Sequence, residues 1–348
     1  MVNAKTFKDG FTWLTKGSKG RYPIILDKDG MHFGYENKLN HWLTLTYKVQ
    51  GVDEKVIIPY AEFAGLKKMF KYWKSELKFM VNQLNNTDFR VSISDGEHVF
   101  SYTYDNRMVP TNEYPSNYGL PFAEGIFNVN DLAESASRLI PFASIDTMRY
   151  FMCGVYIDSE NKALVATDGR RLGYLSFESE LPSMIVPGDA FVKIEGMGEV
   201  IYTVSNEEKN KYLKIENDEK SVTVRLIDGQ FPNWKRVVPP TETDSIKDVV
   251  NLDSFLKASK YAADIADKTG RTRLSDGRFA DVEYTPKTNI DGIFYINATY
   301  LKETLEKMMG ENVDFYAQVA RNGEVETEKA ITITDGTLNA IIMPMCAA

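Results

Sequence analysis

The most regular feature of this 348-residue sequence is one amphipathic helical segment followed by several short alternating segments, a pattern that recurs along the whole length. Apolar residues spaced three and four apart predict helices at 60–74, 130–140, 252–266 and 298–309. Two weaker helical segments contain glycine and fall where a sixfold pattern requires helices, at 5–16 and 193–204. Period-two alternation predicts strands at 91–94, 100–104, 221–224 and 330–334. Such strands favour antiparallel sheets with one buried and one solvated face.

Asp-Gly pairs follow several of the alternating segments, at 95–96, 228–229 and 335–336. Glycine accepts a positive φ without a Cβ clash, so these pairs favour tight hairpin turns. The sequence therefore predicts an α+β fold built from helices and antiparallel hairpins.

Two proline-bearing stretches, 110–121 and 239–243, divide the chain into near-equal thirds. We predict domains at 1–118, 119–240 and 241–348, each with about two helices and two groups of strands. An ordinary α+β protein with accidentally even spacing explains the periodicity equally well.

The charge balance sets limits on the partners of this chain. Its 41 Lys and Arg residues against 49 Asp and Glu residues give a net charge of −8. This excludes a protein coated in basic charge for tight nucleic-acid binding, although a local basic surface remains open.

The cysteines, the apolar runs and the N-terminus indicate the compartment. Cys153 and Cys346 cannot form a disulfide framework or a four-thiolate zinc site. No apolar run reaches the roughly 18 residues of a membrane span, and the N-terminus lacks a signal-peptide core. We expect a reduced, cytoplasmic protein without a membrane partner.

The sequence lacks the usual signatures of enzyme chemistry. No two of His32, His41 and His98 have the one-turn spacing of a metal-binding pair. There is no P-loop and no Gly-x-Ser-x-Gly elbow. We therefore expect no catalytic residues, no metal and no organic cofactor.

Three segments carry a family resemblance. Residues 164–172 read Leu-Val-Ala-Thr-Asp-Gly-Arg-Arg-Leu, and residues 226–239 read Leu-Ile-Asp-Gly-Gln-Phe-Pro-Asn-Trp-Lys-Arg-Val-Val-Pro. Residues 341–345 read Ile-Ile-Met-Pro-Met. In type, order and spacing these segments resemble the bacterial DNA polymerase III β subunit, the sliding-clamp family.

The resemblance implies three similar domains, each with two helices and flanking antiparallel sheets. It also implies a head-to-tail homodimer that closes into a ring around duplex DNA without reading its sequence. Such a ring is non-catalytic. It tethers the DNA polymerase and other clamp-binding-motif proteins, and a clamp loader places it on DNA. A phage or mobile-element clamp and an unrelated α+β enzyme stay open as alternatives.

The resemblance also implies a partner-peptide pocket between the second and third domains. Methionines suit an apolar groove that accepts several peptides. The matching positions are Met152, Thr167, Gly169, Arg170, Arg171, Leu172, Pro232, Arg236, Val237, Asn297, Tyr300, Ile331, Met343, Pro344 and Met345. Of these, Arg171, Arg236 and Asn297 are expected to hold polar groups of the partner. Thr269 stands where the family often carries an aromatic residue, and the chain ends Cys346-Ala347-Ala348 instead of in an arginine-containing tail.

Two further sets of residues follow from the ring. Lys67, Lys71, Lys74 and Lys78 fall on one stripe of a helix that continues past Trp73, and we expect this stripe to face DNA. The companion DNA-facing residues are Arg138, Tyr150, Lys193, Lys257, Lys260 and Lys302. We expect the dimer interface to pair Phe100, Tyr102 and Tyr104 with Tyr261 and Ile265 of the other chain.

Overall fold

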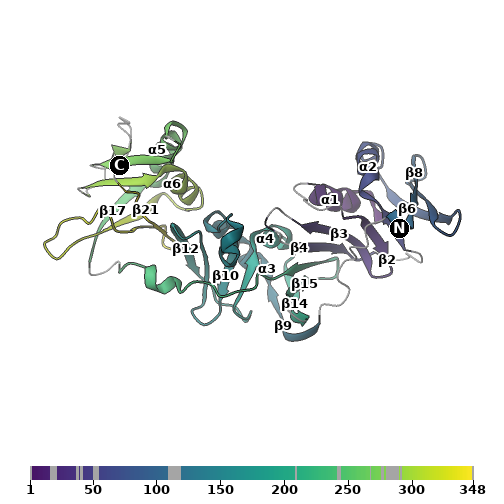
Figure 1. Cartoon of the computed structure of the whole chain (residues 1–348), viewed down its shortest axis with the longest axis horizontal. Helices are drawn as coiled ribbons and strands as arrows, with labels where there is room; N and C mark the ends of the chain where they lie inside the picture. Colours follow the sequence, from purple (N-terminus) through teal and green to yellow (C-terminus); the bar gives the residue numbers. More distant parts are fainter. Residues whose placement is uncertain are drawn as a thin grey trace. The chain divides into compact units, whose positions relative to one another are not determined.

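One order of elements occurs three times along the chain: a strand, a helix, a group of strands, a second helix and three strands (Figure 1). The structure is a computed structural model. It describes residues 2–15, 22–36, 39, 42–49, 55–108, 119–207, 210–240, 244–266, 268–275, 278–279, 290 and 292–346. We call the three occurrences the first, second and third copies. They confirm the predicted α+β class and the recurring pattern.

The first copy runs from the N-terminus to the strand before residue 109. Its elements are β1 (Val2–Asn3), α1 (Ala4–Thr15), β2 (Ile24–Asp27), β3 (Gly30–Glu36), β4 (Trp42–Tyr47), β5 (Val56–Ile58), α2 (Phe63–Met69), β6 (Glu76–Gln83), β7 (Asp88–Ser94) and β8 (Val99–Asp105). Single 3₁₀ turns precede α2 at Tyr60–Glu62 and follow β8 at Asn106–Met108.

The second copy follows the same order. Its elements are β9 (Leu120–Asn128), α3 (Val129–Leu139), β10 (Gly154–Asp158), β11 (Ala163–Thr167), β12 (Arg171–Ser176), β13 (Met184–Pro187), α4 (Gly188–Ile194), β14 (Glu199–Glu207), β15 (Asn210–Glu216) and β16 (Lys220–Arg225). Its 3₁₀ segments are Ile140–Phe142, Thr147–Met152 and Trp234–Val237, and we call the last of these η5.

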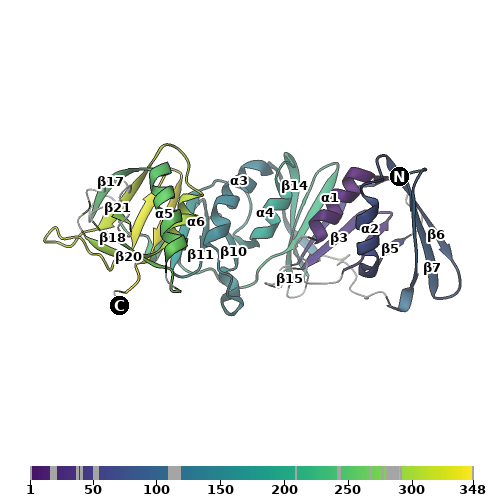
Figure 2. The same cartoon turned by 90° about the horizontal axis from the view of Figure 1, so that it is seen from above.

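The third copy completes the chain. Its elements are β17 (Ser245–Asn251), α5 (Leu252–Ile265), β18 (Arg271–Ser275), β19 (Arg278–Phe279), β20 (Ile293–Asn297), α6 (Ala298–Leu305), β21 (Asn312–Gln318), β22 (Ile331–Thr334) and β23 (Leu338–Ile342). Helices α5 and α6 pack side by side (Figure 2).

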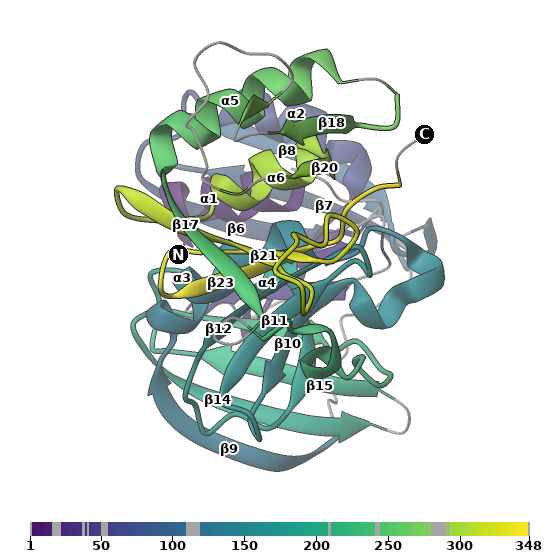
Figure 3. The ribbon, with the colours of Figure 1, turned by 90° about the vertical axis from the view of Figure 1, so that its left-hand side faces the viewer.

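The chain forms two compact units. Residues Met1–Asn130 and Val192–Leu226 make the first, and Asp131–Phe191 and Ile227–Ala348 make the second. The first unit contains an eight-stranded antiparallel sheet in the order β5-β2-β3-β4-β16-β15-β14-β9 and a four-stranded sheet in the order β1-β6-β7-β8. The second contains an eight-stranded sheet in the order β13-β10-β11-β12-β23-β22-β21-β17, which ends with β17 beside β21 (Figure 3), and a three-stranded sheet in the order β19-β18-β20.

Each eight-stranded sheet joins half of one copy to half of the next. In the first unit β4 pairs with β16, and in the second β12 pairs with β23. Pairing at these two junctions satisfies backbone groups that each half-sheet alone leaves open at its edge. Successive copies are thus connected by continuous backbone hydrogen bonding.

Helix α1 contains Gly10, which lowers the helix propensity of this segment, and the packing of the helix explains why glycine stands there. A Cβ built at Gly10 falls 2.3 Å from the ring of Phe33, a fully buried residue of β3. The helix therefore approaches the strand too closely for any side chain at this position. On its buried face Phe7 makes an edge contact with Phe70, with 5.8 Å between ring centroids.

Three sequence expectations match closely and three need correction. The helices predicted at 5–16, 130–140 and 252–266 are confirmed as α1, α3 and α5. The helix predicted at 298–309 is present but ends at Leu305. The helix predicted at 193–204 is wrong. Gly196 and Gly198 adopt φ of +73° and +70°, and an alternating strand, β14, follows them.

The helix predicted at 60–74 ends at Met69. The amides of Tyr72 and Trp73 both donate to the Met69 carbonyl oxygen, and Trp73 turns inward to pack with Phe7. Burial of this indole turns the chain toward β6. The Asp-Gly pairs at 95–96 and 335–336 do connect paired strands, but 228–229 does not.

Arg138 was expected to face DNA, and the structure corrects this. Its side chain on α3 is buried, and its Nη2 forms an ion pair with the Asp335 carboxylate in the turn between β22 and β23. Nε donates to the Lys307 carbonyl oxygen at 2.9 Å, and Nη1 donates to the Thr337 hydroxyl at 2.8 Å. Each of the three guanidinium nitrogens therefore has a partner inside the second unit, and these contacts join the second copy to the third.

Hydrogen bonds also control the charge of Asp335. Burial alone would raise the pKa of this carboxyl, but the amides of Leu338, Thr337 and Met309 donate to it and hold its pKa below the usual range. The carboxylate is consequently the form that the fold stabilises.

No helix in the described part of the chain is both long and apolar enough to span a membrane. Among the same residues no cluster of three or more His, Cys, Asp or Glu side chains has metal-binding geometry. The domain limits predicted at 118/119 and 240/241 adjoin residues 109–118 and 241–243, which lie outside the described residues, as does His41. These limits stay a prediction.

Arg138→Ala is expected to lower the free energy of unfolding by about 3–5 kcal/mol, because it leaves the Asp335 carboxylate buried without its cation. Substitution of the exposed Arg273 by Ala is the matched control and should change the free energy of unfolding by less than about 0.5 kcal/mol.

The stabilisation from Asp335 is present above its unfolded pKa of about 4 and is lost as pH falls through its lower folded pKa. Urea unfolding at neutral pH and below about pH 4 checks both points. Equal effects of the two substitutions would contradict this assignment.

Candidate functional site

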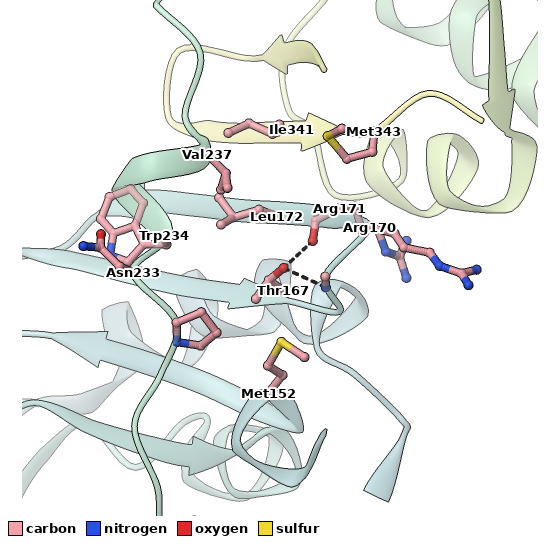
Figure 4. A pocket seen from close by; sticks show the side chains of 12 residues that line it. Met152, Thr167, Arg170, Arg171, Leu172, Asn233, Trp234, Val237, Ile341 and Met343 are labelled. Carbon is pink, nitrogen blue, oxygen red and sulfur yellow. Dashed lines mark hydrogen bonds between the residues drawn. The ribbon is translucent and has the colours of Figure 1, made fainter. Parts of the chain in front are cut away.

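A pocket of about 340 Å³ opens beside the β12–β23 junction, within the second unit (Figure 4). Its wall is mostly apolar. The lining residues are Met152, Thr167, Gly169, Arg170, Arg171, Leu172, Pro232, Asn233, Trp234, Val237, Ile341 and Met343. The two central strands supply Leu172 and Ile341, which are directly paired across the junction.

The turn between β11 and β12 forms one side of the pocket. The Thr167 hydroxyl donates to the Arg171 carbonyl oxygen at 2.7 Å and accepts from the Gly169 amide at 3.0 Å. The Asp168 carboxylate accepts from the amides of Arg170 and Arg171. Gly169 adopts φ of +85°, which other residues adopt with strain. The Thr-Asp-Gly sequence is therefore a turn that fixes where Arg170 and Leu172 lie.

Segment 226–239 forms the opposite side through two aromatic anchors. Phe231 stacks on Tyr156 with 4.7 Å between centroids. The Trp234 indole Nε1 donates to the buried Asp158 carboxylate at 2.9 Å. This hydrogen bond opposes the effect of burial and helps to lower the pKa of Asp158. With its polar atom satisfied, Trp234 can present its ring to the pocket.

The C-terminal segment closes the third side. The Met343 amide donates to the Arg170 carbonyl oxygen at 2.9 Å, and the Met345 amide donates to the Tyr295 carbonyl oxygen at 2.7 Å. Met343 therefore lies against the β11–β12 turn (Figure 4), while Met345 is hydrogen-bonded to β20.

The structure brings most of the predicted pocket residues together. Those that line the pocket are Met152, Thr167, Gly169, Arg170, Arg171, Leu172, Pro232, Val237 and Met343. The others do not line it: Arg236, Asn297, Tyr300, Ile331, Pro344 and Met345. Ile331 is fully buried in β22, and Asn297 caps α6 by accepting from the Tyr300 amide.

Arg171 was expected to hold polar groups of a partner, but its guanidinium is engaged in contacts within the chain. Its side chain is buried, its Nε donates to Asp168 at 3.2 Å, and its Nη2 pairs with Glu303 at 2.7 Å. The guanidinium also lies 4.2 Å from the centroid of the Tyr300 ring. Only Nη1 lacks a partner among the described residues. Arg171 thus mainly connects β12 to α6 and has little left for a partner.

Sequence reasoning missed Asn233, Trp234 and Ile341. All three belong to the quoted motifs, and Asn233 directly follows Pro232, which was selected. Nothing in the sequence shows which members of a motif face a cavity, because that depends on the pairing of β12 with β23.

The lysines expected on one helical stripe do not form it. Lys67 lies on α2, but Lys71 and Lys74 follow the end of that helix and Lys78 belongs to β6. All four are exposed. Among the companions, Lys257 and Lys260 are exposed on α5, where they pair with Asp253 and Glu306 respectively. Lys193, on α4, lies over the ring of Trp13. Lys302 is half-buried on α6, and Tyr150 is half-exposed.

The expected dimer residues divide into two groups. Tyr261 and Ile265 on α5 are 50% and 53% exposed. Tyr102 and Tyr104 on β8 are buried by their own chain, and the Tyr102 hydroxyl donates to the Ile57 carbonyl oxygen at 2.7 Å. These two side chains belong to the core, which corrects the expectation that they supply an interface. Phe100 is half-buried and contacts Tyr102.

Thr167→Val should lower the free energy of unfolding by about 1–2 kcal/mol, because the buried Arg171 carbonyl oxygen and Gly169 amide lose their shared partner. Thr332→Val is the matched control. The Thr332 hydroxyl is buried with no hydrogen-bond partner among the described residues, so its removal should be neutral or stabilising. Denaturant unfolding measures both, and an equal loss in the two variants would contradict the role given to Thr167.

Comparison with known proteins supports the resemblance. The family model for the DNA polymerase III β subunit central domain matches residues 128–233. The "Beta sliding clamp" of Buchnera aphidicola is 22% identical over 284 residues, covering 72% of this chain and 76% of that protein. The protein of the same name from Proteus mirabilis is 25% identical over 214 residues, covering 58% of this chain and 56% of that one.

Solved structures share the fold over nearly the whole length. The DNA polymerase III subunit β of Borrelia burgdorferi, in complex with a natural product, has a TM-score of 0.76 at 18% identity and covers 100% of this chain and 99% of its own. The DNA polymerase sliding clamp of Pseudomonas aeruginosa has a TM-score of 0.72 at 17% identity, with 99% of each chain covered. The family model over the central residues, the relatives and the shared fold all indicate that this chain is similar to the bacterial DNA polymerase III β subunits, the β sliding clamps.

Proposed function

We propose that this chain is a DNA sliding clamp that closes into a ring with a second copy of itself, encircles duplex DNA and tethers the replicative polymerase. It does so as a non-catalytic processivity factor in the cytoplasm, placed on DNA by a clamp loader. The relatives named above are bacterial and carry the clamp name, and they give the phage hypothesis no support.

The observation that supports a ring is that two half-sheets, one in the first copy and one in the third, have no partner strand from another copy among the described strands. In the second and third copies the last strand, β16 or β23, pairs with a strand of the preceding copy. The last strand of the first copy, β8, has no neighbour on its outer edge among the described strands. As far as the described strands go, the three-stranded sheet of the third copy is the other half without a partner.

Head-to-tail pairing of two chains brings these halves together. The β8 edge of one chain then meets the third copy of the other, in the way that β16 and β23 meet their neighbours. Unpaired edges expose backbone donors and acceptors, so such pairing satisfies groups that are otherwise open to other chains. Tyr261 and Ile265 on α5 supply exposed apolar area next to this contact in our proposal.

Enclosure explains how a chain of net charge −8 can stay on DNA. A ring needs only a diffuse positive lining, because strong phosphate contacts would oppose sliding. We assign this lining to helix lysines, chiefly Lys257 and Lys260 on α5 and Lys302 on α6, with Lys67 on α2 and Lys193 on α4. Arg138 is excluded from it by its burial.

The pocket beside β12 and β23 is the site we assign to the polymerase and other clamp-binding-motif proteins. Its apolar wall suits large aliphatic or aromatic side chains of an extended peptide, and Met152 and Met343 can adapt to different ones. A peptide held there keeps the polymerase at a high effective concentration near the DNA it copies.

DNA circularised around the protein tests the ring directly. The chain is mixed with linear duplex, the ends are ligated, and the product is filtered at moderate salt. We expect the chain to elute with closed circles and to be lost after one cut by a restriction enzyme, because a ring leaves only through a free end. Equal retention on closed and cut DNA would indicate ordinary surface binding and contradict the proposal.

A further inference from the structure

The apolar pocket has an excess of positive charge at its edge. The segments that line it, 167–172 and 232–237, contain one carboxylate, Asp168, and four cations, Arg170, Arg171, Lys235 and Arg236. Arg170 lies on the turn between β11 and β12, and Lys235 and Arg236 lie on η5. Figure 4 shows Arg170 and Trp234, the first residue of η5, on different sides of the pocket.

Four carboxylates near the pocket already have partners, whereas Asp228 on segment 226–239 is exposed. Asp168 accepts from Arg171 Nε and from two amides, and Glu303 pairs with Arg171 Nη2. Asp146 pairs with Arg149 at 3.1 Å, and Asp158 accepts from Trp234 inside the fold.

The cations at the edge of the pocket, Arg170, Lys235 and Arg236, are by contrast not paired with a carboxylate among the described residues. The side chains of Arg170 and Arg236 are exposed, and neither has an ion pair among the described residues. Lys235 is also exposed and lies 6.0 Å from the centroid of the Trp234 ring, which keeps its ammonium close to the pocket wall. An occupant of the pocket therefore meets two or three uncompensated cations next to an apolar surface.

We propose that the partner segment bound in this pocket carries acidic residues beside its apolar ones, and that Arg170 and Arg236 select for them. This rests on the proposed function of the pocket as a peptide site. The apolar side chains fill the wall formed by Leu172, Val237 and Met343, and the flanking carboxylates approach the edge cations.

We expect the edge cations to change which peptides bind more than how tightly peptides bind overall. Exposed ion pairs contribute little singly, so two of them favour an acidic flank by about tenfold at low salt. Salt screens such pairs, so the preference should shrink as ionic strength rises from about 0.05 to about 0.5 M. A preference that came from shape alone would not depend on salt.

Two synthetic peptides test this in fluorescence anisotropy against the full chain. Both have the same centre containing leucine and phenylalanine. One has Asp on both flanks and the other has Asn, which has the same shape without charge. We expect the Asp peptide to bind the wild type about tenfold more tightly at low salt. The double variant Arg170→Gln/Arg236→Gln should bring the ratio of the two affinities close to one.

Two variants serve as controls. Arg273→Gln removes an exposed arginine on β18, away from the lining segments, and should leave the ratio unchanged. Val237→Asp places a charge in the apolar wall and should abolish binding of both peptides.

Equal affinity of the two peptides for the wild type, with both lost in Val237→Asp, would overturn the acidic preference while leaving the pocket as a peptide site. Failure of both peptides to bind the wild type would overturn the peptide site itself, and the acidic preference with it. A ratio that falls equally in Arg273→Gln and in the double variant would overturn the assignment to Arg170 and Arg236.

Discussion

Backbone hydrogen bonding between strands of successive copies is the interaction on which the rest of this structure depends. At β4–β16 and β12–β23 an edge that each half-sheet would leave open is paired with the next copy. The candidate site is a direct consequence. Leu172 and Ile341 come from different copies, and only the pairing of their strands places them on one wall.

Two buried arginines reinforce the second of these junctions. Arg138 on α3 pairs with Asp335, and Arg171 on β12 pairs with Glu303. In both pairs the cation belongs to the second copy and the carboxylate to the third. Desolvation offsets much of the attraction in such pairs, so their main effect in our interpretation is to fix register, since a shifted alignment would leave a buried charge alone. Because their guanidinium groups are engaged in these internal contacts, Arg138 does not lie on a DNA-facing surface and Arg171 has only Nη1 left for a partner.

The sequence predicted repeating order better than it predicted local boundaries. Spacing alone placed α3 and α5 almost to the residue, because their apolar faces are continuous. It failed at 60–74, where Trp73 turns inward and ends the helix, and at 193–204, where two glycines precede a strand. Both failures come from tertiary packing and backbone conformation that a periodicity count does not include.

The candidate site shows the same limit. Motif residues such as Thr167 and Val237 lie at the pocket, but a motif does not reveal which members are consumed by internal contacts. Arg171 and Asn297 are used within the fold, and Tyr102 is buried where an interface was expected. Exposure and partner assignment therefore had to come from the structure.

In the proposed ring, the β8 edge, which has no outer neighbour among the described strands, and the third copy of another chain complete each other. Sedimentation equilibrium tests it most directly. The wild type should sediment with a mass about twice the 39.5 kDa of the chain. Ile265→Asp should sediment with the single-chain mass, because its side chain is exposed and the substitution should not disturb folding. A wild type that sediments as a single chain at every concentration would contradict it.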